Sequence, residues 1–153
     1  MGRLQITASL IFIFIVGCSQ ETDTLPSISN NDDDTGRWYS QTQVENGEQL
    51  FQTWCTSCHG LNAEGTQKWK ELSPDGVLPP PPLNGTAHAW HHPLAVLIEV
   101  IDQGGVALGG VMPGFNSHLN YQNKLDVIAF IQQYWPDNIY NQWLIREKAY
   151  RNN

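Results

Sequence analysis

The most informative part of the sequence is WCTSCHG, at positions 54–60. A Cys-x-x-Cys-His run is typical of covalent attachment of a c-type haem. Two thiols three residues apart can reach the two vinyl groups on one side of a porphyrin. The histidine that follows is then held beneath the iron, where a ring nitrogen can bind. The run therefore predicts one haem c, attached through Cys55 and Cys58 and bound at its iron by His59.

Two other uses of the paired cysteines compete with this interpretation. A structural zinc site would need two further ligands, and the sequence contains no second cysteine pair. A thiol–disulfide exchange site is the other candidate, because Trp54 and the two cysteines also resemble the Trp-Cys-x-x-Cys motif of thioredoxins. In thioredoxins that motif follows a buried strand, whereas here it ends an amphipathic helical pattern. Haem attachment is favoured, and thiol exchange through Cys55 and Cys58 stays open as the alternative.

Length and charge exclude several classes of protein. The chain has 153 residues, which suits one domain, and 8 Lys and Arg against 15 Asp and Glu give a net charge of −7. A nucleic-acid partner is not expected, because phosphate contacts need clustered basic side chains. The central part of the chain is rich in Pro and Gly, so short helices alone would bury little apolar area there. A large apolar group inside the domain would complete its core.

The hydrophobic pattern predicts helices and no strands. One helix face is formed by apolar residues spaced three and four apart from Val44 to Trp54. A second helix is expected to open at Pro93 and to end at Gly104. A third is expected to be capped by Asn120 and stopped by Pro136. A short helix at 140–150 is expected in the tail, and the four prolines at 79–82 predict extended chain.

The region from Val44 to Pro136 resembles class I c-type cytochromes, the small monohaem electron carriers. Four pieces in order carry the resemblance: GEQLFQTWCTSCHG at 47–60, PPLNG at 81–85, VMPGF at 111–115, and IAFIQQYWP at 128–136. The family implies an all-α fold in which three to four short helices wrap around one covalently bound haem. It also implies that Gly47 allows the last helix of the domain to approach the first.

The resemblance implies a ligand set. His59 would be the proximal ligand, with its other ring nitrogen held by the backbone carbonyl of Pro81, or of its neighbour Pro82. Met112, the one methionine besides Met1, would be the distal ligand. A histidine is the alternative distal ligand, and the candidates are His88, His91, His92 and His118.

The N-terminus predicts export. Residues 4–17 are almost continuously apolar and follow Arg3, which is typical of a secretory signal and short for a transmembrane helix. The end of this segment, IVGC at 15–18, resembles the lipobox of bacterial lipoproteins, which implies cleavage before Cys18 and a lipid on that residue. An uncleaved N-terminal helix is the alternative. The expected organisation is a lipoprotein signal peptide at 1–17, a lipid-anchored flexible linker at 18–43, a cytochrome c domain at 44–136 and a C-terminal extension at 137–153.

These features together imply a membrane-tethered electron carrier on the periplasmic side, with the inner or outer membrane left open, and not an enzyme. An acidic chain favours a redox partner with a basic docking patch, such as a membrane oxidase, a reductase or a copper protein. The alternative is a haem-based sensor or peroxidase-like enzyme in which Met112 is displaceable. The cluster His88, His91 and His92 could bind copper or zinc, or contact the haem propionates.

Overall fold

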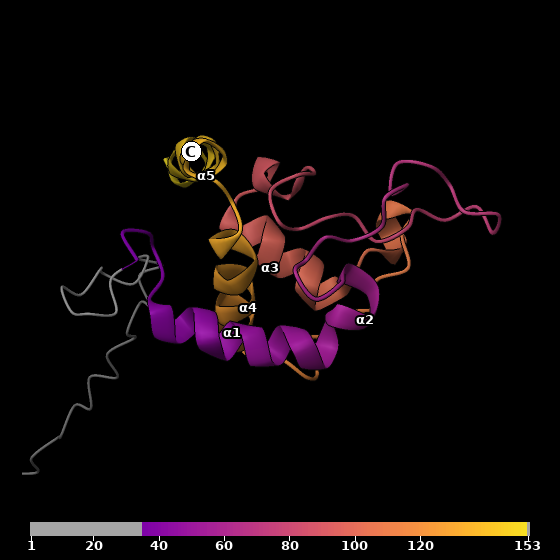
Figure 1. Cartoon of the computed structure of the whole chain (residues 1–153), viewed down its shortest axis with the longest axis horizontal. Helices are drawn as coiled ribbons and strands as arrows, with labels where there is room; N and C mark the ends of the chain where they lie inside the picture. Colours follow the sequence, from indigo (N-terminus) through magenta and orange to yellow (C-terminus); the bar gives the residue numbers. More distant parts are fainter. Residues whose placement is uncertain (1–34, 153) are drawn as a thin grey trace, which may run out of the picture.

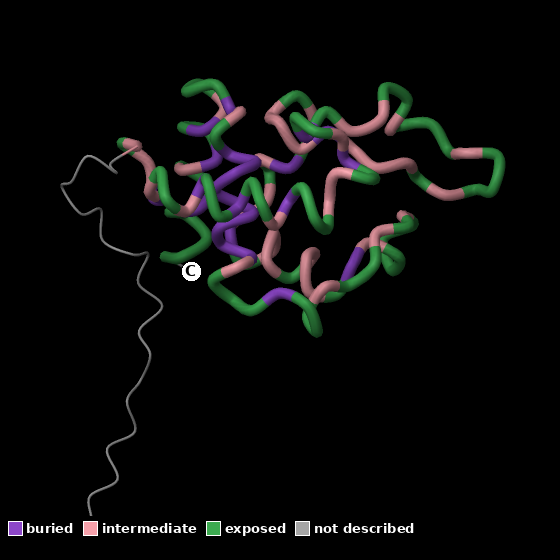
Figure 2. The backbone as a smooth tube through the Cα atoms, turned by 60° about the horizontal axis from the view of Figure 1, so that its bottom comes forward, coloured by how far each residue is buried: buried purple, intermediate pink, exposed green. Residues whose placement is uncertain are grey.

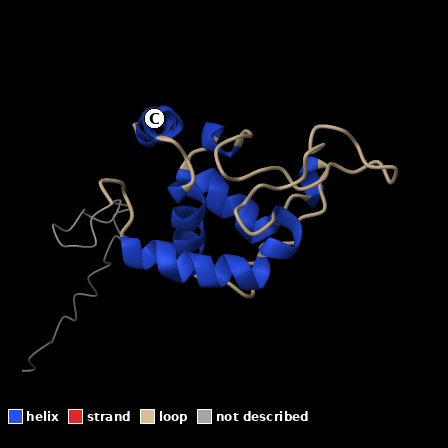
Figure 3. Ribbon diagram, viewed as in Figure 1, coloured by secondary structure: helices blue, strands red, loops and turns tan. Residues whose placement is uncertain are grey.

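The structure, a computed structural model, describes residues 35–152 (Figure 1). The helices are α1 (Gln41–Trp54), α2 (Thr56–His59), α3 (Leu94–Gln103), α4 (Tyr121–Gln133) and α5 (Asp137–Arg151), with 3₁₀ turns η1 (Ala89–His91) and η2 (Val106–Leu108). No strand is present in these residues (Figure 3), where Leu78 and Gly110 form one isolated parallel bridge. The predicted all-α fold is confirmed. The expected signal peptide at 1–17, the lipid site at Cys18 and the linker up to residue 34 lie outside the described residues.

Helix α1 begins earlier than the sequence pattern predicts. Ser40 caps it, because its Oγ accepts a hydrogen bond from the Gln43 amide and the Gln43 side chain accepts one from the Ser40 amide, both at 3.2 Å. Just before the cap, Trp38 and Tyr39 are 5% and 4% exposed. The described end of the expected linker at 18–43 is therefore part of the folded domain, because two aromatic side chains bury their apolar surface there.

Helices α1 and α4 cross in close contact at Gly47. A Cβ atom at this position would lie 1.9 Å from the carbonyl oxygen of Asp126 and 2.9 Å from the Cβ of Phe130. Only a residue without a side chain allows the two backbones to approach so closely. One turn further along α1, the Phe51 and Phe130 rings pack with their centroids 5.0 Å apart. The expectation that Gly47 admits the last helix of the cytochrome-like domain is confirmed by this contact.

Helix α5 is longer than the predicted tail helix and belongs to the core. It begins at Asp137, immediately after Pro136, so this proline both follows α4 and caps α5. Trp143 is fully buried, and its indole Nε1 donates to the carbonyl of His92 at 3.1 Å. Glu147, 1% exposed, accepts a hydrogen bond from the Leu94 amide at 2.7 Å. Because Pro93 at the start of α3 has no side-chain cap of its own, α5 supplies that cap.

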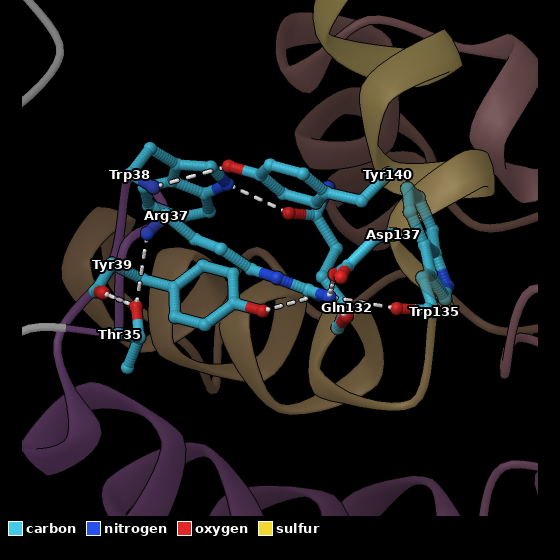
Figure 4. Close-up of polar contacts among 8 residues, drawn as sticks. All are labelled: Thr35, Arg37, Trp38, Tyr39, Gln132, Trp135, Asp137 and Tyr140. Atoms are coloured by element: carbon cyan, nitrogen blue, oxygen red, sulfur yellow. Dashed lines mark hydrogen bonds and ion pairs between the residues drawn. The ribbon is translucent and has the colours of Figure 1, made fainter.

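Arg37 fastens the N-terminal segment to the junction of α4 and α5 (Figure 4). Its guanidinium donates to the carbonyls of Gln132 and Trp135, at 2.6 and 2.8 Å. It also pairs with the Asp137 carboxylate at 3.0 Å and lies over the Tyr140 ring, 4.4 Å from the centroid. One cation thus satisfies two carbonyls at the end of α4 and holds the first turn of α5.

Replacing Arg37 with alanine is expected to lower the free energy of unfolding by about 3 kcal/mol, because hydrogen bonds to a charged group contribute roughly 1.5–3 kcal/mol each and are not additive. Denaturant unfolding of the purified protein would measure the change. Arg146→Ala is the matched control, since Arg146 lies over Trp90 on the surface and bonds only to its own helix at the Gln142 carbonyl. Equal effects of the two substitutions would contradict the assigned role of Arg37.

Burial is uneven across the molecule. Buried residues are concentrated on α4 and on the residues of α1 that pack against it, with a few more on α5, whereas the loop at 61–88 is mostly intermediate or exposed (Figure 2). In α3, Leu94 alone is fully buried, whereas Leu97, Ile98 and Ile101 are partly buried and pack against the core. No helix of the described residues is both long and apolar enough to span a membrane. The half of the domain that contains α2 and α3 therefore has an incompletely covered apolar interior.

Candidate functional site

His59 is held in one orientation by the backbone. The side chain is buried, and its Nδ1 lies 3.0 Å from the carbonyl oxygen of Pro81. Since a carbonyl only accepts hydrogen bonds, Nδ1 carries the proton and the lone pair is on Nε2. Burial lowers the pKa of His59, although the bond to Pro81 opposes that shift. The ring is thus kept neutral, oriented and ready to bind a metal through Nε2.

The two cysteines lie on a single tight turn beside this histidine. Cys55 ends α1, with its amide donating to the Phe51 carbonyl at 2.8 Å, and its own carbonyl accepts from the amides of Cys58 and His59 at 3.1 and 2.9 Å. Cys55 is half-buried, Cys58 is exposed, and the two are not joined in a disulfide. The turn gathers both sulfurs and the imidazole at one end of α1.

The environment of Cys55 does not favour thiol–disulfide exchange. Burial, with a smaller contribution from the neighbouring Cys58, raises the pKa of the Cys55 thiol to about 11. Exchange proteins use a cysteine whose pKa is lowered, because the thiolate is the nucleophile. The segment before the cysteines is a helix and not a buried strand. Both observations weigh against the thioredoxin-like alternative.

The Pro81 carbonyl is itself held by the surrounding chain. Gly65 lies so close that a Cβ there would be 2.4 Å from the Pro81 carbonyl carbon. Two residues beyond Pro81, Leu83 donates its amide to the Ala63 carbonyl and accepts a bond from the Trp135 indole, both at 2.8 Å. Trp135 is 1% exposed. The loop after His59 and the end of α4 together fix the proline-rich turn against the imidazole.

Trp135→Phe is expected to lower the free energy of unfolding by about 2 kcal/mol, because it leaves the Leu83 carbonyl without its indole donor. It is also expected to loosen the turn that orients His59, which would shift the reduction potential of the haem-loaded protein. Trp143→Phe is the matched control, because it loses an indole bond to a different carbonyl, that of His92. Thermal unfolding and redox titration of both variants would test this: an unchanged potential in Trp135→Phe would contradict the positioning role.

Met112 lies in a loop that is anchored on the end of α3. The Met112 carbonyl accepts the Gly105 amide at 2.9 Å, and a Cβ on Gly104 would lie 2.4 Å from that same oxygen. Three residues later, the Phe115 amide donates to the carbonyl of Ile101 at 2.9 Å. Gly104 has φ +81°, a conformation that L-residues with side chains rarely adopt. The loop is thus seated on α3 by backbone contacts, and the Met112 residue is half-buried.

The residues around this site fit a large apolar group. Exposed apolar side chains occur on the segments that flank His59 and Met112, namely Leu61, Leu78, Val106, Leu108 and Val111. The inner residues of α3 are only half-buried, as described above. Soluble proteins cover such surfaces when they can. Two thiols and an oriented imidazole on one turn, with a methionine in a loop seated on α3, are the donor set that a covalently bound haem requires.

The histidine cluster has a different environment from the one a metal ion needs. His88 stacks on Trp69 at a centroid distance of 5.1 Å and meets His92 edge-on at 5.7 Å, while His91 packs against Trp90 at 3.9 Å. Within residues 35–152 no three His, Cys, Asp or Glu side chains are placed to hold a metal ion. The copper or zinc interpretation of this cluster is therefore not supported. The sequence did not predict that Trp69 would pack on His88.

The helical fold and the Cys-x-x-Cys-His turn are those expected of a c-type cytochrome. A family model described as "Cytochrome C oxidase, cbb3-type, subunit III" matches residues 42–131, more than half of the chain, and the chain belongs to this family. No curated protein and no solved structure was found to match it. Family membership confirms that the domain carries covalently attached haem c and serves haem-based electron transfer.

Proposed function

We propose that this protein is a one-electron carrier whose haem c is attached through Cys55 and Cys58 and bound axially by His59 and Met112. The observation that carries the proposal is the 3.0 Å contact between His59 Nδ1 and the Pro81 carbonyl, which leaves the lone pair of Nε2 available to bind the iron. A hydrogen bond from the other ring nitrogen to a backbone carbonyl orients a metal-binding histidine and raises its basicity. The loop that seats Met112 on α3 supports the assignment of the second ligand.

The residues would act by holding both iron oxidation states in one geometry. Haem c, when bound, supplies a one-electron Fe(III)/Fe(II) couple. Pro81 fixes the tautomer and the ring plane of His59, and the Gly104 contact fixes the backbone of Met112. Two protein ligands leave no vacancy for a substrate, which argues against catalysis at the iron. A thioether also favours the ferrous state, so His/Met ligation raises the reduction potential.

We further propose that the chain is exported and tethered to a membrane by a lipid on Cys18, facing the periplasm. The family description names an oxidase, which supports a membrane oxidase as the redox partner. Burial raises the pKa of Tyr134, and the negative charges of Glu48 and Glu64 add to the shift. The exposed carboxylates of Glu48 and Glu64 both lie near Tyr134, so they place negative charge on the same side of the molecule. A basic patch on the partner would be attracted to it, and salt would slow the encounter.

Visible absorption spectra of the protein, produced in a host that attaches haem c, test the central proposal. Spectra are recorded in the oxidised and reduced states, with and without carbon monoxide. Sharp reduced bands, the weak far-red band of methionine-bound ferric iron and no response to carbon monoxide are expected. If the reduced protein binds carbon monoxide, the electron-carrier assignment is wrong and a haem-based sensor or peroxidase-like function is favoured instead. Absence of haem would overturn the attachment and return Cys55 and Cys58 to thiol exchange.

A further inference from the structure

Lys124 of α4 and Asp102 of α3 form an ion pair at positions where the dipole of each helix disfavours the charge. The Lys124 Nζ contacts Asp102 Oδ1, the lysine side chain is 9% exposed, and this carboxylate oxygen is itself buried. Lys124 stands in the first turn of α4 and Asp102 in the last turn of α3. Helix dipoles disfavour a cation at the first position and an anion at the second. Burying the lysine charge also costs several kcal/mol, whereas the Asp102 side chain remains 31% exposed. The helix dipoles and the burial of the lysine therefore do not account for this ion pair, and its role must be sought in what the two helices hold.

The end of α3 that carries Asp102 is the platform for the Met112 loop. The Ile101 carbonyl accepts the Phe115 amide at 2.9 Å, and a Cβ on Gly114 would lie 2.5 Å from the Asp102 carbonyl oxygen. On the other side of the ion pair, α4 is locked to α1 through the Gly47 contact at Asp126, two residues after Lys124. Asp102 thus touches the loop with its backbone and touches α4 with its side chain.

We propose that the Asp102–Lys124 ion pair positions Met112, by fastening the loop's platform on α3 to the rigid crossing of α1 and α4. Neither residue belongs to the proposed set of haem ligands, so they are positioning residues. The inference rests on the proposed role of Met112 as the distal ligand. When the pair is broken, the end of α3 and the loop on it are free to separate from α4, and Met112 leaves the iron more often.

Imidazole binding to the ferric, haem-loaded protein measures how often Met112 leaves. An external ligand binds only after the methionine departs, so its apparent affinity scales with the open fraction. Asp102→Asn is expected to raise the apparent imidazole affinity by about tenfold and to weaken the far-red methionine band, with covalent haem retained. Glu71→Gln is the matched control, because it breaks the exposed Lys68–Glu71 pair in the loop far from α4. That variant is expected to bind imidazole as the unmodified protein does.

A double variant separates positioning from stability. Asp102→Asn leaves a buried lysine unpaired, which also destabilises the fold. Asp102→Asn combined with Lys124→Met removes both charges and is expected to recover the melting temperature of the ferrous protein. It is still expected to bind imidazole about tenfold more tightly, because the link to α4 is gone. An imidazole affinity that returns to that of the unmodified protein together with the melting temperature would overturn the proposal.

The same experiment distinguishes the failure of this inference from failure of the ligand assignment. If the unmodified protein lacks the far-red band, or binds imidazole without displacing a ligand, Met112 is not the distal ligand and the inference falls with it. If the unmodified protein shows the band and Asp102→Asn changes neither the band nor the imidazole affinity, the ligand assignment stands and the positioning role is wrong.

Discussion

Met112→Ala is expected to abolish the far-red band of the ferric protein and to lower its reduction potential by on the order of 0.2 V, since axial ligands set haem potentials over a range of about 0.8 V. The variant is also expected to bind carbon monoxide when reduced, because a ligand position becomes vacant. Haem attachment should be unaffected, since Cys55, Cys58 and His59 lie on a different segment. Absorption spectra and redox titration measure these changes.

Val111→Ala is the matched control for this result. Val111 is the neighbour of Met112 in the same loop, and its side chain is 51% exposed. Its replacement is expected to leave the band, the potential and the carbon monoxide response unchanged. A Met112→Ala protein that keeps the band and potential of the unmodified protein would show that another residue is the distal ligand. His118 would then be examined first, because its ring packs against Trp54, the residue before Cys55, at 4.8 Å.

Gly47→Ala is expected to lower the free energy of unfolding by about 3 kcal/mol, since overpacking costs 1–3 kcal/mol or more and the gain in helix propensity of about 1 kcal/mol does not offset a contact with backbone. The added Cβ would meet the Asp126 carbonyl oxygen at 1.9 Å, and a backbone atom cannot turn aside as a side chain can. Helices α1 and α4 must therefore separate. Chemical unfolding of the haem-loaded protein measures the loss.

Asn46→Ala controls for the effect of alanine in the same helix. Asn46 precedes Gly47, is exposed and lies in the same turn of α1. Its replacement is expected to change the free energy of unfolding by less than about 0.5 kcal/mol, as surface substitutions usually do. If Gly47→Ala proved as mild as Asn46→Ala, the close crossing of α1 and α4 would not be the contact that holds the domain together.

The features that the sequence predicted are those with a local physical cause. The Cys-x-x-Cys-His run forms one turn because its spacing is helical, and Asn120 caps α4 because its side chain accepts from the Asn123 amide at 2.9 Å. The contact of His59 with the Pro81 carbonyl was expected from family resemblance and is present in the structure. The ligand roles of His59 and Met112 stay predictions until spectra are recorded.

The features that the sequence did not predict depend on partners far apart in the chain. Trp38 and Tyr39 stand among polar residues in a segment predicted to be linker. They are buried against Gln132 and Tyr140, which lie about one hundred residues further along the chain. Glu147 reads as an ordinary surface glutamate of an amphipathic tail, yet it caps α3. The hydrophobic pattern of a short stretch of sequence cannot indicate contacts between residues so far apart, because these contacts form only in the tertiary fold. The extra aromatic residues of the tail were the available signal that α5 packs on the domain.

The early start of α1 would also set where the redox centre lies relative to the lipid anchor proposed at Cys18. The segment that follows the proposed anchor leads into α1 at Ser40, and the haem-attachment turn begins at Cys55, after the other end of the same helix. Fourteen helical residues separate these points by about 21 Å at 1.5 Å per residue. Because Trp38 and Arg37 hold the start of α1 against α4 and α5, α1 would keep the haem-attachment turn at a fixed distance from the point where the chain enters the domain. The proposed lipid anchor would therefore lie toward one end of α1 and the redox centre toward the other, where a partner in the same membrane could reach it.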